Sequence, residues 1–311
     1  MGDALRSAEA EQLPQTVPET VAWTVAETVE KVARELAPLL GDQATSEARE
    51  LVAAVLDQPR FWPSFAAAAH LAPSDVRAIE RATARRARGA PLAYAVRSAP
   101  FRHLTLYVDE RVLIPRPETE YLVECVLALP EARRGGIAVD VGTGSGAIAL
   151  ALASEGDLAR VVGTDLSADA IAVARHNATR LSSLLRAAVE FRTGDALAPL
   201  EDLAQSVDLL LCNPPYIAFA ELASLPAGVR DWEPPQALVC PDDGLAVTQA
   251  VVQGGRRLLR AGGMLAFETD SRRAQRVAQR VRDDGAYEEV RVLHDLTGRE
   301  RYVLARRRSI D

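Results

Sequence analysis

The amino-acid sequence predicts an α/β protein. We expect a doubly wound, mostly parallel seven-stranded sheet, preceded by a small helical domain and a linking β-hairpin. From about residue 22 to residue 90 apolar side chains follow helical spacing, whereas from residue 136 onward seven short β-rich runs alternate with helical stretches. Such alternation is typical of a parallel sheet with helices on both faces. The length of 311 residues fits about two domains.

The first part of the chain reads as a tail followed by a helical domain. Residues 1–20 contain many Glu, Gln and Thr residues and two prolines, so we expect a flexible tail. Residues 46–58 and 74–89 have the spacing of amphipathic helices, and so does a stretch ended by Gly41: Val25, Val29, Val32, Leu36 and Leu40. They predict a helical domain over residues 21–97. Because every chemical motif lies beyond it, we expect this domain to recognise the substrate.

The pattern changes near residue 98. Residues 101–115 (FRHLTLYVDERVLIP) alternate apolar and polar side chains, which predicts a β-hairpin, and we expect the linker to span residues 98–114. Residues 115–311 then form the sheet domain, whose β-rich runs are 137–141, 160–165, 187–193, 207–212, 262–268, 287–293 and 299–305. Ligands of such sheets bind at the carboxyl ends of the strands, where the strand order reverses.

Composition and charge are those of an ordinary globular protein. Hydrophobic residues make up 48% of the chain, charged residues 25%, and the formal net charge is −7. The acidic balance argues against a surface devoted to nucleic acid, although it leaves room for a local basic patch. The sequence shows neither a signal-peptide pattern nor 18 unbroken apolar residues, so we expect a cytoplasmic protein without a membrane span.

Neither a disulfide framework nor a metal site is expected. The cysteines are odd in number and show no CxxC spacing, and we expect small buried side chains: Cys125, Cys212 and Cys240. The histidines are scattered with no nucleophile beside them, which favours surface or packing roles: His70, His103, His176 and His294.

A glycine-rich loop follows the first predicted strand of the sheet. In VDVGTGSGAIAL, residues 139–150, three glycines separate the strand from a helix: Gly142, Gly144 and Gly146. Without a Cβ atom at these positions the backbone can approach a ligand closely. The GxGxG spacing differs from the GxGxxG of many dinucleotide-binding loops, and alone it is compatible with a tight turn or with NAD or FAD binding.

Two acidic residues end the next predicted strands. Asp165 follows the glycine loop by about twenty residues, where a carboxylate can accept both hydroxyls of a ribose. A helix N-cap is the alternative role, although Ser167 or Asp169 could also fill it. Asp195 ends a further strand, where a turn or N-cap role is equally compatible. The loop and the two acids in this order indicate a cofactor that contains adenosine.

The stretch LLLCNPPYIAF, residues 209–219, ends a buried strand with a rigid polar corner. Asn-Pro is a common turn opener, so a simple turn is the alternative. The prolines would hold the Asn213 carboxamide and the Pro214 carbonyl in one geometry, so that both accept hydrogen bonds from a planar NH2 group that Tyr216 covers. Such an amide nitrogen is a poor nucleophile, and aiming its lone pair at an activated sulfonium methyl would favour methyl transfer.

These motifs together resemble S-adenosylmethionine-dependent methyltransferases of planar nitrogens. Over about residues 45–305 the resemblance is closest to the release factor glutamine N5-methyltransferases. It is carried by GAPLAY (89–94), VLIPRPETEYLVE (112–124), VRDWEP (229–234), DDGL (242–245) and DLTGRERYV (295–303). The resemblance implies a Rossmann-like methyltransferase fold and methyl transfer to the glutamine of the Gly-Gly-Gln motif in class I peptide-chain release factors, which tunes translation termination.

The resemblance also implies roles for individual residues. Those implied to bind S-adenosylmethionine are Gly142, Thr143, Gly144, Ser145, Gly146, Asp165, Leu166, Asp195, Ala196 and Asn213. Those implied to seat the glutamine amide and carry catalysis are Asn213, Pro214, Pro215 and Tyr216. Those implied to line the opening for the substrate loop are Arg116, Pro117, Glu118, Thr119 and Glu120. The last group also reads as a helix start, with Pro117 near position N1 and acids favoured by the helix dipole.

The sequence departs from the family pattern at two places, and it is compatible with other functions. Glu268-Thr269-Asp270 replaces a frequent Glu-Ile-Gly, and AVRSAPF lacks a glycine before the hairpin. The same corner would serve an enzyme that methylates a ribosomal-protein glutamine or adenine N6 of a nucleic acid. A non-catalytic S-adenosylmethionine-binding assembly factor would be expected to lose Asn213 or the glycines. We expect a monomer that binds no nucleic acid stably.

Overall fold

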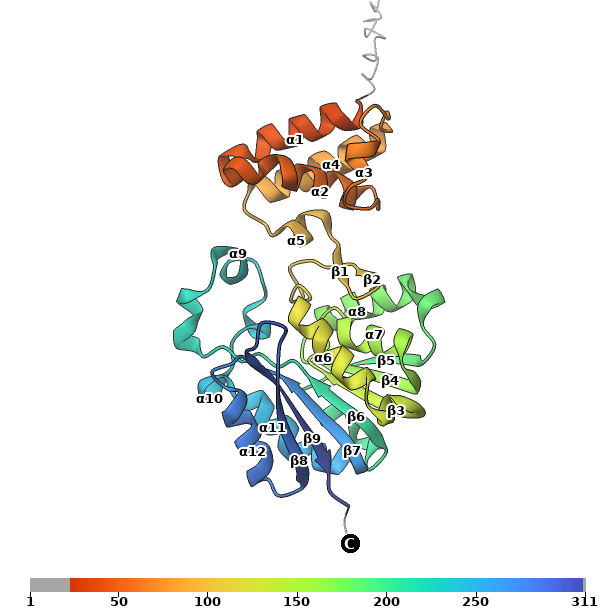
Figure 1. Ribbon diagram of the computed structural model, residues 1–311, viewed down its shortest axis with the longest axis vertical. Coiled ribbons are helices and arrows are strands. Elements are labelled where there is room, and N and C mark those ends of the chain that lie inside the picture. Colours follow the sequence, from red (N-terminus) through yellow and green to blue (C-terminus); the bar gives the residue numbers. More distant parts are fainter. Residues whose placement is uncertain (1–22, 310–311) are drawn as a thin grey trace, which may run out of the picture. The chain divides into compact units, whose positions relative to one another are not determined.

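A computed structural model describes residues 23–309 of the chain (Figure 1). The predicted tail over residues 1–20 lies outside the described residues. Contacts divide the chain into two compact units with the boundary after Ala84.

The first unit is helical. It contains α1 (Val25–Leu40), α2 (Ala44–Val55), the short α3 (Trp62–Phe65) and most of α4 (Pro73–Ala87). Thr24 and Glu27 form a capping box at the start of α1, because each side chain binds the backbone N–H of the other. At the other end Gly41 has a φ of 52°, which glycine adopts at little cost. The helices expected from apolar spacing are therefore present.

After the last residues of α4, the second unit continues with α5 (Leu92–Val96) and a short antiparallel hairpin of β1 (Ala99–Phe101) and β2 (Leu104–Leu106). The strand pairing stops at Leu106, well before the end of the predicted linker. The side chain of Asn177 explains this end. Its Oδ1 accepts from Tyr107 N at 2.7 Å and its Nδ2 donates to Tyr107 O at 2.9 Å. The backbone of Tyr107 is thus satisfied without a partner strand.

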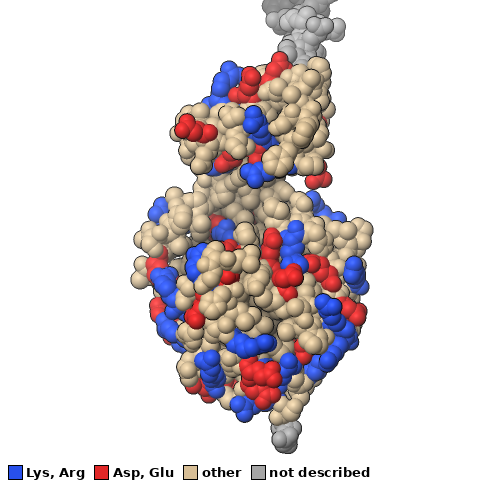
Figure 2. All heavy atoms as spheres, viewed as in Figure 1, with Lys and Arg blue, Asp and Glu red and all other residues tan. Residues whose placement is uncertain are grey.

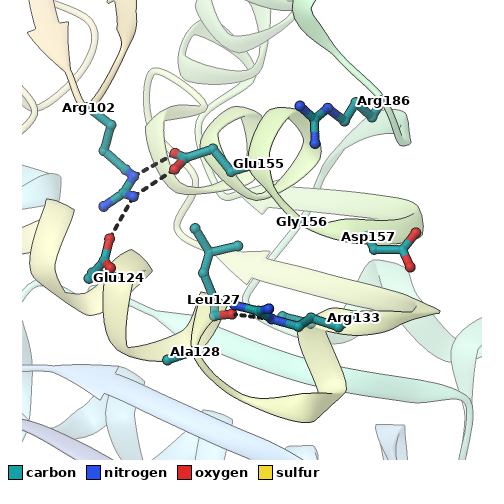
Figure 3. Close-up of a pocket in the computed structure, with 10 residues that line it drawn as sticks. Arg102, Glu124, Leu127, Ala128, Arg133, Glu155, Gly156, Asp157 and Arg186 are labelled. Atoms are coloured by element: carbon teal, nitrogen blue, oxygen red, sulfur yellow. Dashed lines mark hydrogen bonds and ion pairs between the residues drawn. The ribbon is translucent and has the colours of Figure 1, made fainter.

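An arginine at the hairpin turn ties the hairpin to two helices. The Arg102 guanidinium donates to both carboxylate oxygens of Glu155, at 2.5 and 2.6 Å, and to Glu124 at 2.7 Å (Figure 3). Glu155 ends α7 (Ala147–Glu155) and Glu124 lies on α6 (Pro117–Leu127). The hollow in Figure 3 also borders Arg133 and Asp157, which begin β3 and β4. It therefore lies at the amino ends of these strands, the edge opposite to the expected ligand site.

The seven-stranded sheet has the order β5-β4-β3-β6-β7-β9-β8. Its strands are β3 (Arg133–Val141), β4 (Asp157–Asp165), β5 (Ala188–Thr193), β6 (Val207–Cys212), β7 (Leu259–Glu268), β8 (Tyr287–His294) and β9 (Glu300–Arg307). The first five strands of the order pair in parallel, and β9 is antiparallel to β7 and β8. This confirms the predicted fold class. The strand order reverses between β3 and β6, which makes their carboxyl ends the switch point.

Helices cover both faces of the sheet (Figure 1). On one face α6, α7 and α8 (Ala168–Arg180) pack in one core, and on the other α11 (Ala246–Leu258) and α12 (Ala274–Asp283) pack in a second. Successive side chains of β6 pack in opposite cores: Leu209 and Leu211 belong to the first, Leu210 and Cys212 to the second. A strand buried on both faces reads as an unbroken apolar run, which is why VDLLLC shows no polar alternation.

Short helical turns join these elements. They are α9 (Ala227–Arg230), α10 (Pro241–Gly244) and the 3-10 helices Gly41–Gln43, Pro130–Ala132, Ser182–Leu184, Ala198–Leu203, Phe219–Ser224 and Pro235–Ala237. No helix within residues 23–309 is long and apolar enough to cross a membrane. On the face shown in Figure 2 the second unit carries basic and acidic side chains intermixed, without one large basic field.

Candidate active site

The glycine loop joins β3 to α7 through three residues with positive φ. Gly142, Gly144 and Gly146 have φ values of 74°, 54° and 84°. The loop is held against β4, because Gly142 N and Thr143 N both donate to Thr164 O, at 2.8 and 2.9 Å. A Cβ on Gly146 would lie 3.2 Å from Leu150 and from Phe191, so close helix–sheet contact also requires this glycine.

A buried aspartate that the sequence analysis did not single out binds the glycine loop and the start of α7 by hydrogen bonds. Asp140 Oδ2 accepts from Thr143 Oγ1 at 2.6 Å and from Ala149 N at 3.2 Å. The residue is fully buried, and this burial raises the pKa of its carboxyl to about 7. An acid inside the otherwise apolar run IAVDV is the sequence signal that could have revealed it.

Asp165 lies at the end of β4 and binds two backbone groups. Its Oδ2 accepts from Gly144 N and its Oδ1 from Ser167 N, each at 2.9 Å. Ser167 itself caps α8 by accepting from Ala170 N at 3.2 Å, so Asp165 is not that helix's N-cap. Burial raises the pKa of Asp165, and the two N–H donors oppose that rise. A carboxylate has about four acceptor positions, so two remain for a ligand.

Seven of the ten predicted cofactor residues line one cavity, called here the glycine-loop cavity. The predicted residues that line it are Gly142, Gly144, Asp165, Leu166, Asp195, Ala196 and Asn213, together with Pro215 from the predicted catalytic set. Apolar side chains from distant segments complete its wall, among them Val112, Leu113 and Ala237. Thr143, Ser145 and Gly146 do not line it, because they are buried within the loop itself.

A smaller neighbouring cavity, called here the corner cavity, surrounds the NPPY segment. It is lined by Leu113, Arg116, Asn213, Pro214, Tyr216, Ile217, Val229, Ala237 and Leu238. Asn213 lines both cavities, so it stands where they meet. Burial raises the pKa of Tyr216 from its ordinary value near 10 to about 12, so its phenol is neutral near pH 7 with a wide margin.

The RPETE segment begins α6, and its first residue lines the corner cavity. Pro117 begins α6, and Glu118 and Glu120 lie in its first turn. Pro117, Glu118 and Glu120 line neither cavity, whereas Arg116 lines the corner cavity. The Arg116 guanidinium donates to Glu233 Oε1 at 2.5 Å.

The partner of Arg116 is buried, and one further contact joins this segment to Asn213. Glu233 is 3% exposed, and burial raises the pKa of its carboxyl against the opposing effect of Arg116. Thr119 is also buried, and its Oγ1 accepts from Asn213 Nδ2 at 3.1 Å. The sequence analysis implied that Thr119 and Asn213 both belong to the substrate site, but it did not predict that they are in direct contact.

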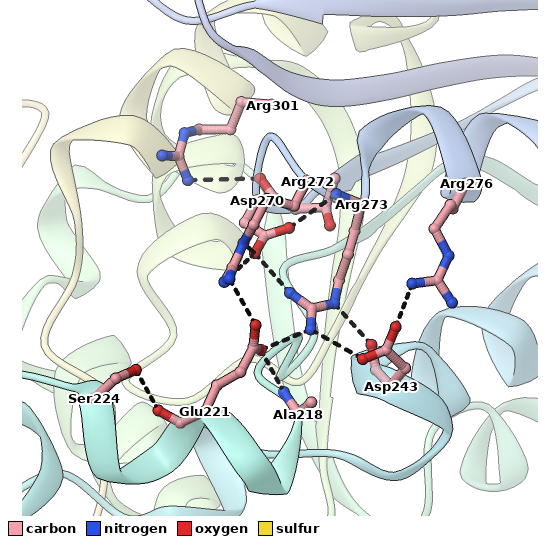
Figure 4. Close-up of polar contacts among 10 residues, drawn as sticks. Ala218, Glu221, Ser224, Asp243, Asp270, Arg272, Arg273, Arg276 and Arg301 are labelled. Carbon is pink, nitrogen blue, oxygen red and sulfur yellow. Dashed lines mark hydrogen bonds and ion pairs between the residues drawn. The ribbon is translucent and has the colours of Figure 1, made fainter.

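A buried arginine anchors the segment that follows NPPY (Figure 4). Arg273, whose side chain is 3% exposed, donates at 2.7 Å to Glu221 Oε2, Asp270 Oδ2 and the backbone oxygen of Asp243. Sequence analysis missed this cluster, although DDGL and the Asp270 departure both belong to it. The arginine therefore connects the start of α12 to two points of the segment between β6 and α11.

The backbone conformation of the DDGL motif fits its close contact with Tyr216. Asp242 and Asp243 have φ values of 55° and 54°, and Gly244 has 81°. A Cβ on Gly244 would lie 2.1 Å from Tyr216 O, so only glycine fits there. Ion pairs to α12 hold the two aspartates, Asp242 with Arg280 and Asp243 with Arg276. The motif thus supports the backbone of Tyr216.

Comparisons with known proteins point to one family. The family described as "Methyltransferase domain" matches residues 133–307. The chain is 44% identical to the release factor glutamine methyltransferase of Moorella thermoacetica, over 77% of this chain and 83% of the relative. It is 41% identical to that of Mycolicibacterium smegmatis, over 76% and 81%. With that of Cereibacter sphaeroides it shares 38% identity, over 85% and 92%.

Among solved structures, a methyltransferase from Pyrococcus furiosus superposes with a TM-score of 0.48 and 17% identity, over 66% of this chain and 89% of that chain. The three sequence relatives are each more than 30% identical to the chain and are matched over most of their length. The chain belongs to the family of release factor glutamine methyltransferases.

Proposed function

We propose that the protein transfers the methyl group of S-adenosylmethionine to the side-chain amide nitrogen, N5, of the glutamine in the Gly-Gly-Gln motif of class I release factors. The observation that carries this proposal is the place of Asn213, on the wall of two adjoining cavities. One cavity has the lining for an adenosine-containing cofactor and the other for a planar amide. A group at their junction can touch both reactants.

The residues of the glycine-loop cavity fit S-adenosylmethionine. Asp165 keeps acceptor capacity for two ribose hydroxyls after binding Gly144 N and Ser167 N. The apolar side chains of Val112, Leu113 and Ala237 give an adenine ring a surface to lie against. Gly142 and Gly144 line the cavity without side chains, which leaves room for the methionine part.

The residues of the corner cavity fit a glutamine amide. The Asn213 Oδ1 and the Pro214 carbonyl would each accept one hydrogen of the substrate NH2, while Tyr216 would cover its face. Holding both hydrogens favours a pyramidal nitrogen, whose lone pair can then be aimed. The neutral phenol of Tyr216 adds no charge beside the amide.

Bound S-adenosylmethionine would supply a methyl group on a positively charged sulfur. Attack of the glutamine nitrogen on this methyl carbon would break the carbon–sulfur bond and leave its electron pair on sulfur, so the by-product would be S-adenosylhomocysteine. The methylated amide then loses one N–H proton to water. Asn213 and Pro214 act by position, and no side chain of the corner has to take the proton.

The relatives support a release factor as the substrate. All three reported relatives are named release factor glutamine methyltransferases, and the chain covers more than four fifths of each. We extend the proposal to the helical domain, residues 21–97, as the part that recognises the release factor, with residues 98–114 as linker and 115–311 as methyltransferase domain. Translation takes place in the cytoplasm, where we expect the protein to act as a monomer.

The test is single-turnover methyl transfer from labelled S-adenosylmethionine to a purified class I release factor. Asn213→Ala should lower the rate by about 10²–10³ while cofactor affinity stays close to that of the wild type. The change removes the side-chain oxygen that would accept a hydrogen bond from the substrate NH2 group in the transition state. Asn213→Asp should also abolish transfer, since it adds a charge and removes the NH2 group.

Ribosomes, DNA and RNA serve as competing acceptors in the same assay. Faster transfer to ribosomal protein or to nucleic acid than to release factor would replace the proposed substrate. A near-normal rate for Asn213→Ala would show that the corner is only a turn.

A further inference from the structure

A buried carboxylate lies beside the corner and takes no part in the steps above. Glu268 ends β7, is 1% exposed, and its Oε2 has no hydrogen-bond partner. A buried carboxylate oxygen without a partner costs free energy, so a compensating role is expected.

Strand order brings Glu268 next to Asn213. Strands β6 and β7 pair in parallel, with Cys212 opposite Phe267. The next residue of each chain segment, Asn213 after β6 and Glu268 at the end of β7, therefore lies at the same carboxyl edge of the sheet. Thr119, in the first turn of α6, connects them. Its Oγ1 accepts from Asn213 Nδ2 at 3.1 Å, and its hydroxyl lies close enough to the Glu268 carboxylate to lower the pKa of that group. Three segments that are distant in sequence thus meet at the Thr119 hydroxyl.

An ionised Glu268 would set the direction of the hydrogen bonds at this hydroxyl. Such a carboxylate can only accept, so a Thr119 hydroxyl that turns toward Glu268 donates its single hydrogen to it. The Thr119 oxygen then offers only lone pairs to Asn213, which must turn its NH2 group toward Thr119. The Asn213 Oδ1 is consequently directed away from Thr119 and is free to accept from a ligand in the cavities.

We propose that Glu268 and Thr119 are positioning residues that hold the Asn213 carboxamide with its oxygen toward the substrate amide. This rests on the proposed function, because only an NH2 substrate requires an acceptor there. A flipped Asn213 would place its own NH2 against the NH2 of glutamine, and two donors would meet. Neither Glu268 nor Thr119 needs to touch the reactants.

The same arrangement makes methyl transfer depend on pH. Burial raises the pKa of Glu268 to about 7. The charged and titratable groups that face it come from the start of α6, from the corner and from β9: Arg116, Glu118, Tyr216, Arg301 and Tyr302. Once protonated, Glu268 can donate to Thr119 and no longer forces the Thr119 hydrogen toward itself. The transfer rate should therefore fall as pH drops through about 7.

The first experiment changes Thr119 and measures single-turnover transfer to release factor, with cofactor affinity in parallel. Thr119→Val should lower the rate about tenfold to a hundredfold at unchanged cofactor affinity, because the amide of Asn213 is no longer oriented. Thr119→Ser keeps the hydroxyl and should restore most of the rate. Thr269→Val is the matched control: Thr269 is also buried and adjoins Glu268, but its hydroxyl has no partner. It should leave the rate unchanged.

The second experiment uses Glu268→Gln, which keeps the shape and removes the buried charge. We expect a higher melting temperature together with a rate about tenfold lower and loss of the pH dependence near 7. A more stable protein with wild-type rate and pH profile would mean that Glu268 is only structural, and would overturn the proposal. So would a wild-type rate in Thr119→Val.

Asn213→Ala separates this failure from failure of the proposed function. If Asn213→Ala abolishes transfer while Thr119→Val and Glu268→Gln do not slow it, only the positioning proposal falls. If Asn213→Ala transfers normally, the seat itself is wrong and the positioning proposal falls with it.

Discussion

At the scale of single residues, Asp165 combines a structural and a proposed binding task. It holds Gly144 N and Ser167 N in place and, in the proposed complex, the ribose hydroxyls. Asp165→Ala should weaken S-adenosylmethionine binding by about 2–3 kcal/mol, because it removes these acceptors together. Calorimetry measures this affinity. Asp169→Ala, an exposed change in the same turn, is the control and should bind normally. Unchanged affinity in Asp165→Ala contradicts the ribose assignment.

Glu268 also affects stability, in a direction that follows from its pKa. Burial raises that pKa from about 4.5 to about 7, so the folded state holds the proton more tightly than the unfolded state. The stabilisation is complete below pH 4.5 and is lost as pH rises to about 7. Glu268→Gln removes the loss, so the variant should gain on the order of 3 kcal/mol relative to wild type between pH 4.5 and 7.5. Urea unfolding at both pH values measures it, and an equal difference at the two would refute it.

At the scale of elements, Arg273 joins α12 to the segment between β6 and α11 (Figure 4). Arg273→Ala leaves Asp270 and Glu221 without this buried cation and should cost about 3 kcal/mol. We expect faster amide exchange around Glu221 and Asp243 and a higher KM for release factor, with exchange in β3, β4 and β5 unchanged. Hydrogen exchange by mass spectrometry measures the first effect.

The neighbour of Arg273 provides the control for this change. Arg272 contacts the same two carboxylates, Asp270 and Glu221, but its side chain is 67% exposed. Arg272→Ala should therefore change stability by less than about 1 kcal/mol, because solvent screens exposed ion pairs. Equal effects of the two substitutions would show that burial of Arg273 does not matter.

At the scale of the whole molecule, the two units allow a division of labour to be tested. A chain that begins at Gly89 keeps α5, whose Tyr94 is buried in the core of the second unit and donates to Val112 O at 2.6 Å. This shortened protein should bind S-adenosylmethionine normally and methylate a short Gly-Gly-Gln peptide as fast as the full chain does. It should methylate intact release factor much more slowly. Equal rates on intact release factor would give the helical domain another task.

The sequence alone determined the features that depend on neighbouring residues. Alternation of β-rich and helical runs predicted the sheet, because apolar periodicity reports the local backbone and the face it buries. Gly142, Gly144 and Gly146 were found for the same reason, since the need for positive φ is local. Their position at strand ends, with Asp165 and Asn213, then followed from the general rule for parallel sheets.

Only the tertiary structure decided which distant side chains meet. Asn213 contacts Thr119 across 94 positions of sequence, and Glu268 joins them because β7 lies next to β6. The pairing of Arg273 with Glu221 spans 52 positions. No local pattern encodes such contacts, because they depend on strand order and on the burial that folding creates. Asp140 and Glu268 are ordinary carboxylates in the unfolded chain, and only burial in the folded sheet raises the pKa of each to about 7.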